Sequence, residues 1–171
     1  MPYYLSNTMD SMPAAPPPAR VEAPVARWLT PAEQQHWRAY LEANLSVMRR
    51  LESDLSAHTG MHMGEYEVLV RLSEAPGAKL RMSDLADDTV ASRSRLSHQI
   101  TRMESAGLVA REACPTDRRG SFAVLTPAGV ARLEAAAPSH VESVRRVLTD
   151  VLTPAEFAEL GRLSAKILSG L

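Results

Sequence analysis

The most constraining stretch of this chain lies between residues 80 and 126, where two hydrophobic periodicities follow one another. Over residues 96–103 apolar residues recur every three or four positions, the spacing of one buried helix face. The pattern then changes to an alternation of apolar and polar residues over 108–113 and again over 122–125, as in two short strands. The chain is therefore predicted to be mainly α with a small β-hairpin.

Two helices are expected before the hairpin. The second would begin after Ser92, whose side-chain oxygen can cap it, and stop at Gly107, which accepts a left-handed backbone. The first would begin near Ser83, capped by the serine hydroxyl, and a short turn would join the two. This order predicts a helix-turn-helix, in which the first helix braces the second against the DNA backbone.

The outward face of the second helix is polar and carries no acid before Glu104. Its short hydroxyl-bearing or cationic side chains are Ser94, Arg95, Ser97, His98, Thr101, Arg102 and Ser105. Arginine can bridge the two acceptors of guanine, and small hydroxyls allow close approach to base edges. A solvated face usually mixes both charge signs, so this composition favours a DNA-reading face.

The hairpin is expected to be tipped by Asp117, Arg118, Arg119 and Gly120. Arg118 and Arg119 can enter a narrow minor groove or contact phosphate, while Asp117 can orient one guanidinium by a charge-assisted hydrogen bond. Taken alone, such a tip fits a solvated turn equally well. Its position directly after a helix-turn-helix favours a wing that contacts DNA, with Ser83 of the brace helix as a further contact.

Together these motifs resemble the MarR family of bacterial transcriptional regulators. The resemblance rests on DRRG at 117–120, LTPAG at 125–129, RME at 102–104 and GLV at 107–109, and it covers about residues 29–168. It implies a homodimeric winged helix-turn-helix repressor that releases DNA when a small aromatic or phenolic ligand binds or a cysteine is oxidised. It places base reading on Ser94, Arg95, Ser97, His98, Thr101 and Arg102, and wing contacts on Arg118 and Arg119.

The net charge of −1 does not itself indicate a nucleic-acid partner, because neutralising phosphate requires cations. The charges are unevenly spread, however, with six arginines against three acids over residues 93–119. The single cysteine, Cys114, excludes an internal disulfide framework and fits a reducing cytoplasm. It is expected to be a small strand-end residue, with a redox role open if arginines lie close. No signal peptide or bilayer-length apolar run is present, so a cytoplasmic protein without membrane contact is expected.

Enzymatic, cofactor and metal sites are not expected. The sequence has no nucleophile elbow, phosphate-binding loop or paired-carboxylate pattern. His58 and His62 are the one close histidine pair, and Gly60 between them disrupts the helical geometry that a metal pair would use.

Residues 1–27 form a proline- and alanine-rich tail that is expected to be disordered, and residues 28–171 a MarR-type domain. Within that domain, about 62–126 would be the winged helix-turn-helix, with dimerisation helices at about 30–58 and 127–169. Three helices are expected to start at a threonine cap followed by proline, at Thr30, Thr126 and Thr153.

The terminal helices carry more apolar surface than a small wing domain can cover, which predicts an isologous homodimer. Its two recognition helices would reach major grooves about 34 Å apart, so the operator would be an inverted repeat in double-stranded DNA. The alternative is a monomer whose terminal helices pack on its own core.

Aromatic side chains occur towards the end of one expected helix and the start of the next. The candidates for a ligand site are Trp37, Tyr40, His62 and Tyr66. The family resemblance places aromatic effectors at this junction, with Arg38, Arg49 or His62 meeting an acid group. Ordinary core packing is the alternative. The sequence thus predicts a sequence-specific DNA-binding regulator, a repressor released by a small aromatic ligand; the alternative is a winged-helix protein-interaction module without DNA binding.

Overall fold

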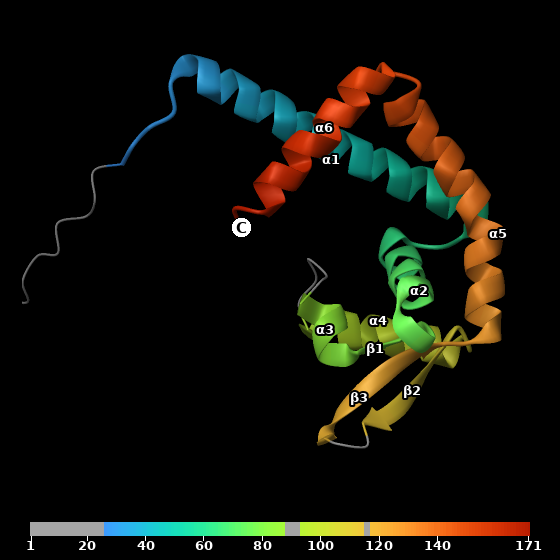
Figure 1. Cartoon of the computed structure of the whole chain (residues 1–171). Coiled ribbons are helices and arrows are strands. Elements are labelled where there is room, and N and C mark those ends of the chain that lie inside the picture. Colours follow the sequence, from blue (N-terminus) through green and yellow to red (C-terminus); the bar gives the residue numbers. More distant parts are fainter. Residues whose placement is uncertain (1–25, 88–92, 115–116) are drawn as a thin grey trace, which may run out of the picture.

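The computed structural model describes residues 26–87, 93–114 and 117–171, without the side chains of Asp87, Arg93, Arg118 and Arg119. It has two parts (Figure 1). The part that we call the head contains α2 (Met63–Glu74), a 3₁₀ turn (Pro76–Ala78), β1 (Lys79–Arg81), α3 (Met82–Asp87), α4 (Arg93–Ser105), β2 (Val109–Cys114) and β3 (Asp117–Leu125). The terminal helices are α1 (Pro31–Thr59), α5 (Pro127–Val144), which continues into a π-helical turn (Arg145–Thr149), and α6 (Pro154–Leu168). The expected mainly α class with a small β wing is confirmed.

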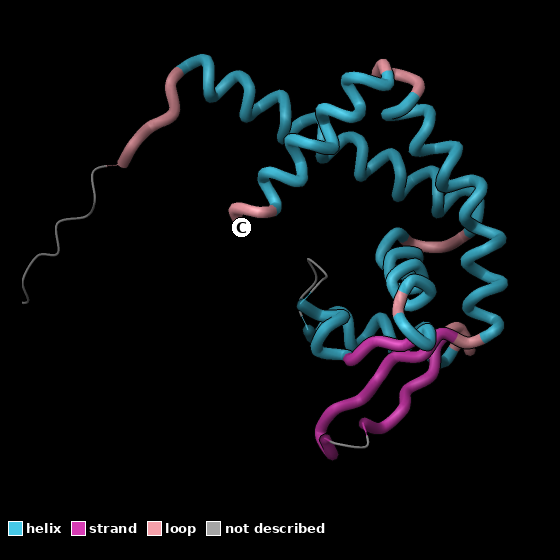
Figure 2. Tube along the Cα trace, viewed as in Figure 1, coloured by secondary structure: helices cyan, strands magenta, loops and turns pink. Residues whose placement is uncertain are grey.

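The sheet has three antiparallel strands in the order β1-β3-β2. Leu80 of β1 lies opposite Ala123 of β3, and Ala110 of β2 lies opposite Val124 on the other side. Figure 2 shows β2 and β3 projecting from the head on the side away from the terminal helices. The sequence predicted two strands and missed β1, because three residues between a turn and a helix are too few to show an alternating pattern.

The start of β3 corrects the expected wing tip. Cys114 pairs with Asp117, whereas its neighbour Ala113 pairs with Ser121. Residues 118–120 therefore lie within β3 between these two paired positions, and they do not form the expected turn. The connection itself falls at residues 115–116, outside the described part of the chain. A Cβ at Gly120 would come within 2.8 Å of Asp117 Oδ2, so glycine permits this irregularity. The Arg-Arg-Gly run concealed the strand because it interrupts apolar alternation.

The expected cap of α3 is also wrong. The helix begins at Met82, one residue before Ser83, and the Ser83 hydroxyl donates to Asp84 Oδ1 at 3.0 Å. Ser83 is exposed inside the first turn. The predicted cap Ser92 of α4 lies outside the described residues, whereas Gly107 after α4 has the expected left-handed backbone, with φ 72°.

The three threonine-proline starts are confirmed as helix caps. Thr30 Oγ1 accepts from the Glu33 N–H at 3.2 Å, and the Glu33 carboxylate accepts from the Thr30 N–H at 2.7 Å. Thr153 forms the same reciprocal box with Glu156. Thr126 accepts from the Gly129 N–H at 3.0 Å and starts α5. These bonds satisfy amide donors that a helix start leaves unpaired.

One apolar cluster fills the head and extends to the terminal helices. Its completely buried residues are Leu69, Leu72, Leu85, Ile100 and Ala123. Leu55 near the end of α1 and Ala136 in the middle of α5 belong to the same cluster. The head is therefore packed directly onto one end of α1 and onto α5.

Polar contacts join α5 to α1 beside that cluster. Buried Ser143 donates to the carboxylate of Asp54, and Arg132 Nη2 donates to the Thr59 carbonyl at 2.5 Å. The hydrogen bonds from Ser143 and Arg50 hold the pKa of Asp54 below its ordinary value. The end of α1 is thus hydrogen-bonded to α5 at two points, Asp54 and Thr59.

The outer parts of the terminal helices are exposed in the single chain. Every residue of α6 is exposed, and so are residues 31–46 of α1. Helix α6 and residues 31–46 of α1 therefore do not pack on the core of their own chain, whereas the monomer alternative expected them to do so. Within the described ranges, no helix combines the length and apolar character needed to span a bilayer.

Candidate nucleic-acid interface

Helix α4 has the two faces that its sequence predicts. Leu96, Ile100 and Met103 are almost completely buried beneath it. The exposed residues are Ser94, Arg95, Ser97, His98, Thr101, Arg102 and Ser105. The apolar residues fix the rotation of α4 about its axis, so the polar face points outwards as a set. Contact of this face with DNA stays a prediction.

Two hydroxyls of that face are already used inside the protein. Thr101 donates to the Ser97 carbonyl at 2.9 Å, and Ser105 donates to the Thr101 carbonyl at 2.9 Å, both one turn back along α4. Arg111 of β2 also reaches across to this side of the helix. The sequence could not reveal the hydrogen bonds between Arg111 and α4, because they join a strand residue to a helix and no single repeating pattern contains both.

The base of the wing holds a second arginine that sequence reasoning missed. Arg81 of β1 lies 3.8 Å from Asp117, donates to Cys114 Sγ at 3.1 Å and lies over the Phe122 ring. Asp117 was expected to orient one of the wing arginines, and here it pairs with Arg81. The side chains of Arg118 and Arg119 lie outside the description, so their wing roles stay predictions. Cys114 is buried at the strand end, as expected.

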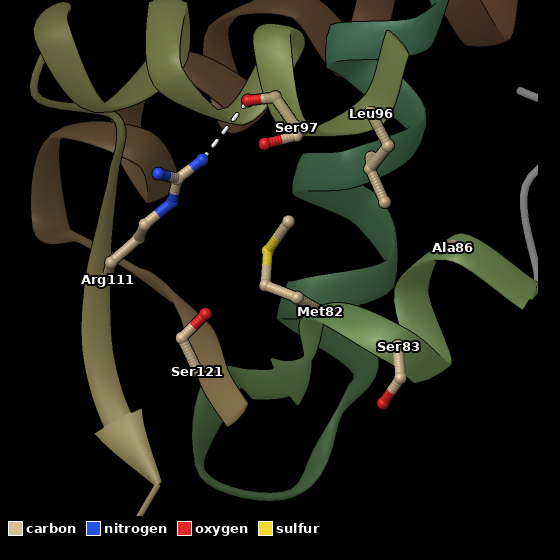
Figure 3. Close-up of a pocket in the computed structure, with 7 residues that line it drawn as sticks. All are labelled: Met82, Ser83, Ala86, Leu96, Ser97, Arg111 and Ser121. Atoms are coloured by element: carbon tan, nitrogen blue, oxygen red, sulfur yellow. Dashed lines mark hydrogen bonds between the residues drawn. The ribbon is translucent and has the colours of Figure 1, made fainter. Parts of the chain in front are cut away.

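An open hollow of about 290 Å³ separates α4 from the sheet (Figure 3). Its lining residues are Met82, Ser83, Ala86, Leu96, Ser97, Arg111 and Ser121. The figure shows the Arg111 guanidinium extending from β2 over one side of this hollow towards Ser97. The side chain thus connects α4 to β2 across this hollow.

Comparison with known proteins agrees with this architecture. The MarR family profile matches residues 61–121, which run from the start of α2 into β3. The crystal structure of AbsC, a MarR family transcriptional regulator from Streptomyces coelicolor, is 51% identical and covers 85% of this chain and 100% of its own, with a TM-score of 0.76. The chain belongs to the MarR family of transcriptional regulators.

Two further relatives support the assignment. Sco3205, a MarR family regulator from Streptomyces coelicolor solved in complex with DNA, is 43% identical over 85% of this chain and 92% of its own, with a TM-score of 0.80. The transcriptional regulator HosA from Escherichia coli O111:H- is 35% identical over 43% of this chain, and the match spans 53% of HosA. MarR family regulators are non-enzymatic proteins. Among the described residues, no group of three His, Cys, Asp or Glu side chains could hold a metal.

The MarR-like LTPAG segment has a structural explanation here. The Thr126 hydroxyl is within hydrogen-bond distance of the carbonyls of Gly107, at 2.7 Å, and Leu108, at 3.0 Å. A Cβ at Gly129 would overlap the Leu108 carbonyl oxygen. The segment therefore joins the exit of α4, the end of the wing and the start of α5 in one tight contact, and glycine is required at its last position.

The four candidate ligand residues do not share one cavity in the single chain. Tyr66 lines a hollow of about 260 Å³ with Met48, Leu51, Met63, Glu67, Val70, Arg71 and His140. Trp37 and Tyr40 are not among the described residues that line it. Their rings lie 6.0 Å apart, and Trp37 is eleven residues before Met48, about 16 Å along α1. Trp37 and Tyr40 are close to Tyr66 in the sequence, but the length of α1 keeps them apart from it in space.

His62 lies at the junction of α1 and α2 and is engaged with Glu52. Its Nδ1 is 2.8 Å from Glu52 Oε1, and the other carboxylate oxygen accepts from the Met63 N–H at 2.7 Å. The hydrogen bond with Glu52 raises the pKa of His62. Arg49, another candidate for an acid group, donates to Ser46 Oγ at 3.2 Å.

His140 is a residue of the Tyr66 hollow that sequence reasoning missed. Its ring lies 4.5 Å from that of Tyr66, and burial lowers its pKa. It comes from the C-terminal part of α5, 74 residues after Tyr66 in sequence, so no local motif indicates the pair.

Proposed function

We propose that this MarR family regulator binds double-stranded DNA as a homodimer, with α4 in the major groove and the wing beside it. The observation that carries this proposal is the exposed face of α4, acid-free up to Glu104 and held in place by three buried apolar residues. The DNA complex of the related Sco3205 supports it. The base-reading residues would be Ser94, Arg95, His98 and Arg102, with Ser97 and Thr101 beside them. Ser83, Arg118 and Arg119 would contact the DNA backbone, and Asp117 would orient an arginine at the base of the wing.

The terminal helices support the dimeric form of the proposal. Phe157, Leu160 and Leu163 recur along one side of α6 and are exposed. Leu160 and Leu163 also line an open apolar hollow of about 650 Å³ between α1, the π-helical turn that follows α5, and α6. Exposed apolar surface of this extent marks an interaction site. An isologous partner would cover it and would present two α4 helices to an inverted repeat.

Release by a small aromatic or phenolic ligand is the finer part of the proposal. The Tyr66 hollow lies where α1, α2 and α5 meet, and it offers an aromatic wall, Arg71 and His140. His62 borders this junction, while Trp37 and Tyr40 lie on the exposed part of α1 that a partner would cover. A ligand that binds one arrangement of these helices better than the other would shift the separation of the two heads.

The DNA-binding proposal is tested by selecting sites from a random duplex pool and measuring the salt dependence of binding. We expect an inverted repeat whose half-sites are about 10 base pairs apart, and an affinity that falls steeply with salt. The alternative, a winged-helix protein-interaction module, predicts no enriched site and no salt slope. The effector proposal is tested by titrating the selected duplex complex with phenolic and aromatic acids, where no change in affinity would contradict it.

The proposal retains the predicted division of the chain into a tail over residues 1–27 and a MarR-type domain over residues 28–171. Transcriptional regulation also requires access to chromosomal DNA, so a cytoplasmic location remains part of the proposal.

A further inference from the structure

Arg111 forms a clamp between the wing and the recognition helix. Its Nη2 donates to the Ser97 carbonyl and to Thr101 Oγ1, both at 3.1 Å. Its Nε lies 3.8 Å from Glu104 Oε2, while the Arg111 backbone N–H donates to Glu104 Oε1 at 3.3 Å. The side chain is about one-third exposed. One residue of β2 thus contacts three successive turns of α4.

The three contacted positions lie on one side of α4. Ser97, Thr101 and Glu104 are spaced by four and three residues, so they form a row along the helix. A guanidinium is planar and its donors are fixed in direction, so it can hold a carbonyl, a hydroxyl and a carboxylate at the same time. Rotation of α4 about its axis, or sliding along it, would break these bonds.

The clamp also changes the role of Thr101. Its hydroxyl donates to the Ser97 carbonyl and accepts from Arg111, so its single proton and one acceptor site are occupied before DNA arrives. Reading a base with this hydroxyl would require breaking the bond to Ser97 or sharing the remaining acceptor site.

We propose that Arg111 is a specificity-positioning residue, which fixes the recognition helix through Thr101 and the Ser97 carbonyl while Glu104 orients its guanidinium. Arg111 does not itself read a base, and Thr101 acts as its partner. This inference rests on the proposed DNA binding and assigns a role to a residue outside the outward face of α4. A helix held to within about 0.5 Å can match base edges, whereas a looser helix still meets phosphates.

The main competing role for Arg111 is a direct phosphate contact, and salt dependence separates the two. A phosphate contact would be retained by Arg111→Lys, which keeps the charge, and lost in Arg111→Met with a salt slope smaller by about 0.9 per contact. A positioning role needs the planar fork, so both variants should lose specificity. Their salt slopes should equal that of the wild type.

The experiment uses the full chain, a selected operator duplex and a scrambled duplex of the same composition. In Arg111→Lys and Arg111→Met, we expect the ratio of operator to scrambled affinity to fall about tenfold, as loss of hydrogen bonds to a charged group suggests. Affinity for the scrambled duplex should stay unchanged. Arg145→Lys is the matched control, because Arg145 pairs with Asp150 in the terminal part of the chain, and it should leave the ratio unchanged.

Substitutions at Thr101 sharpen the test. Thr101→Ser keeps the hydroxyl and should retain specificity, whereas Thr101→Val removes it and should lose specificity. If the two residues act as one unit, combining Thr101→Val with Arg111→Met should cost little more than either change alone. Fully additive losses would show that Thr101 reads DNA independently, and would overturn the assignment of Thr101 as the partner of Arg111.

The outcomes separate this inference from the proposed function. Wild-type protein that enriches no DNA site would contradict the proposed function itself. Wild-type protein that binds its site, with Arg111→Lys equally specific, would overturn the clamp alone. A folded Arg111→Met variant with a reduced salt slope would assign Arg111 to phosphate instead. Thermal unfolding of each variant identifies any loss that comes from misfolding. If Arg111→Met misfolds, the specificity and salt slope of a folded Arg111→Lys variant decide the question.

Discussion

The head and α6 differ in how far they bury their apolar side chains. Leu69, Leu85 and Ile100 of the head are completely buried within one chain, whereas Phe157 and Leu163 of α6 remain 39% and 44% exposed. The same helical spacing of apolar residues therefore gives a buried face where the chain itself supplies a covering surface, and an exposed face where it does not. The head buries its apolar residues within the chain, with help from the inner ends of α1 and α5, whereas α6 leaves apolar surface that the proposed partner would cover.

The largest expected effect comes from removing the uncovered surface. Deleting residues 152–171 should abolish the dimer and strongly weaken operator binding, because α6 contributes no buried residue to its own chain. Analytical sedimentation checks the assembly. Leu163→Glu should give the same dissociation, while Ala158→Glu, on the other side of α6, should not. A truncated chain that still sediments as a dimer would place the interface elsewhere.

The destabilisation caused by a core substitution in the head should not depend on whether the protein is a monomer or a dimer. Leu69→Ala is expected to lower the free energy of unfolding by about 2–5 kcal/mol, because it leaves a cavity at a fully buried site. Leu163→Ala is the matched change in the terminal part, and its cost should disappear on dilution to monomers. Urea unfolding at several protein concentrations checks both. Equal concentration dependence for the two variants would contradict the distinction between the two parts.

A surface change on α4 should affect recognition without affecting either core. Arg95→Ala is expected to weaken specific binding by about 1–3 kcal/mol and to relax preference at one operator position, since a base-edge contact is lost. Site selection repeated with the variant measures this directly. An unchanged base preference would remove Arg95 from the base-reading set.

The smallest expected effect lies at the junction of the two parts. The pKa of His62 is raised in the folded protein, first by its hydrogen bond to Glu52 and also by Glu65, against an opposing influence of Arg102. The protonated form is therefore favoured by folding. This stabilisation is complete below the ordinary value of 6.5 and is lost as pH rises through the raised pKa.

Urea unfolding across that pH window, at constant salt, checks the effect. His62→Gln should flatten the pH dependence. Because the pair is exposed, added salt should also reduce the effect. A wild-type profile that rises with pH over this window would contradict the sign.

Sequence reasoning succeeded where one element carries its own signal. The buried and exposed faces of α4 follow from a single helical period, and the threonine-proline starts of α1, α5 and α6 follow from local hydrogen bonds. It failed where the signal is shared between elements. Strand β1 exists because β3 offers it an edge, and Arg111 reaches α4 only because β2 is folded beside it. His140 joins Tyr66 for the same reason.

Helix α5 packs against both α1 and α2, so it connects the two parts of the molecule. Its 18 residues extend about 27 Å, and a rotation of about 4° at one end would displace the other by about 2 Å. That displacement exceeds the alignment error that a base-edge hydrogen bond tolerates. In the proposed dimer, a few degrees of tilt would therefore suffice to move a recognition helix out of register, without any element of the head changing its internal structure.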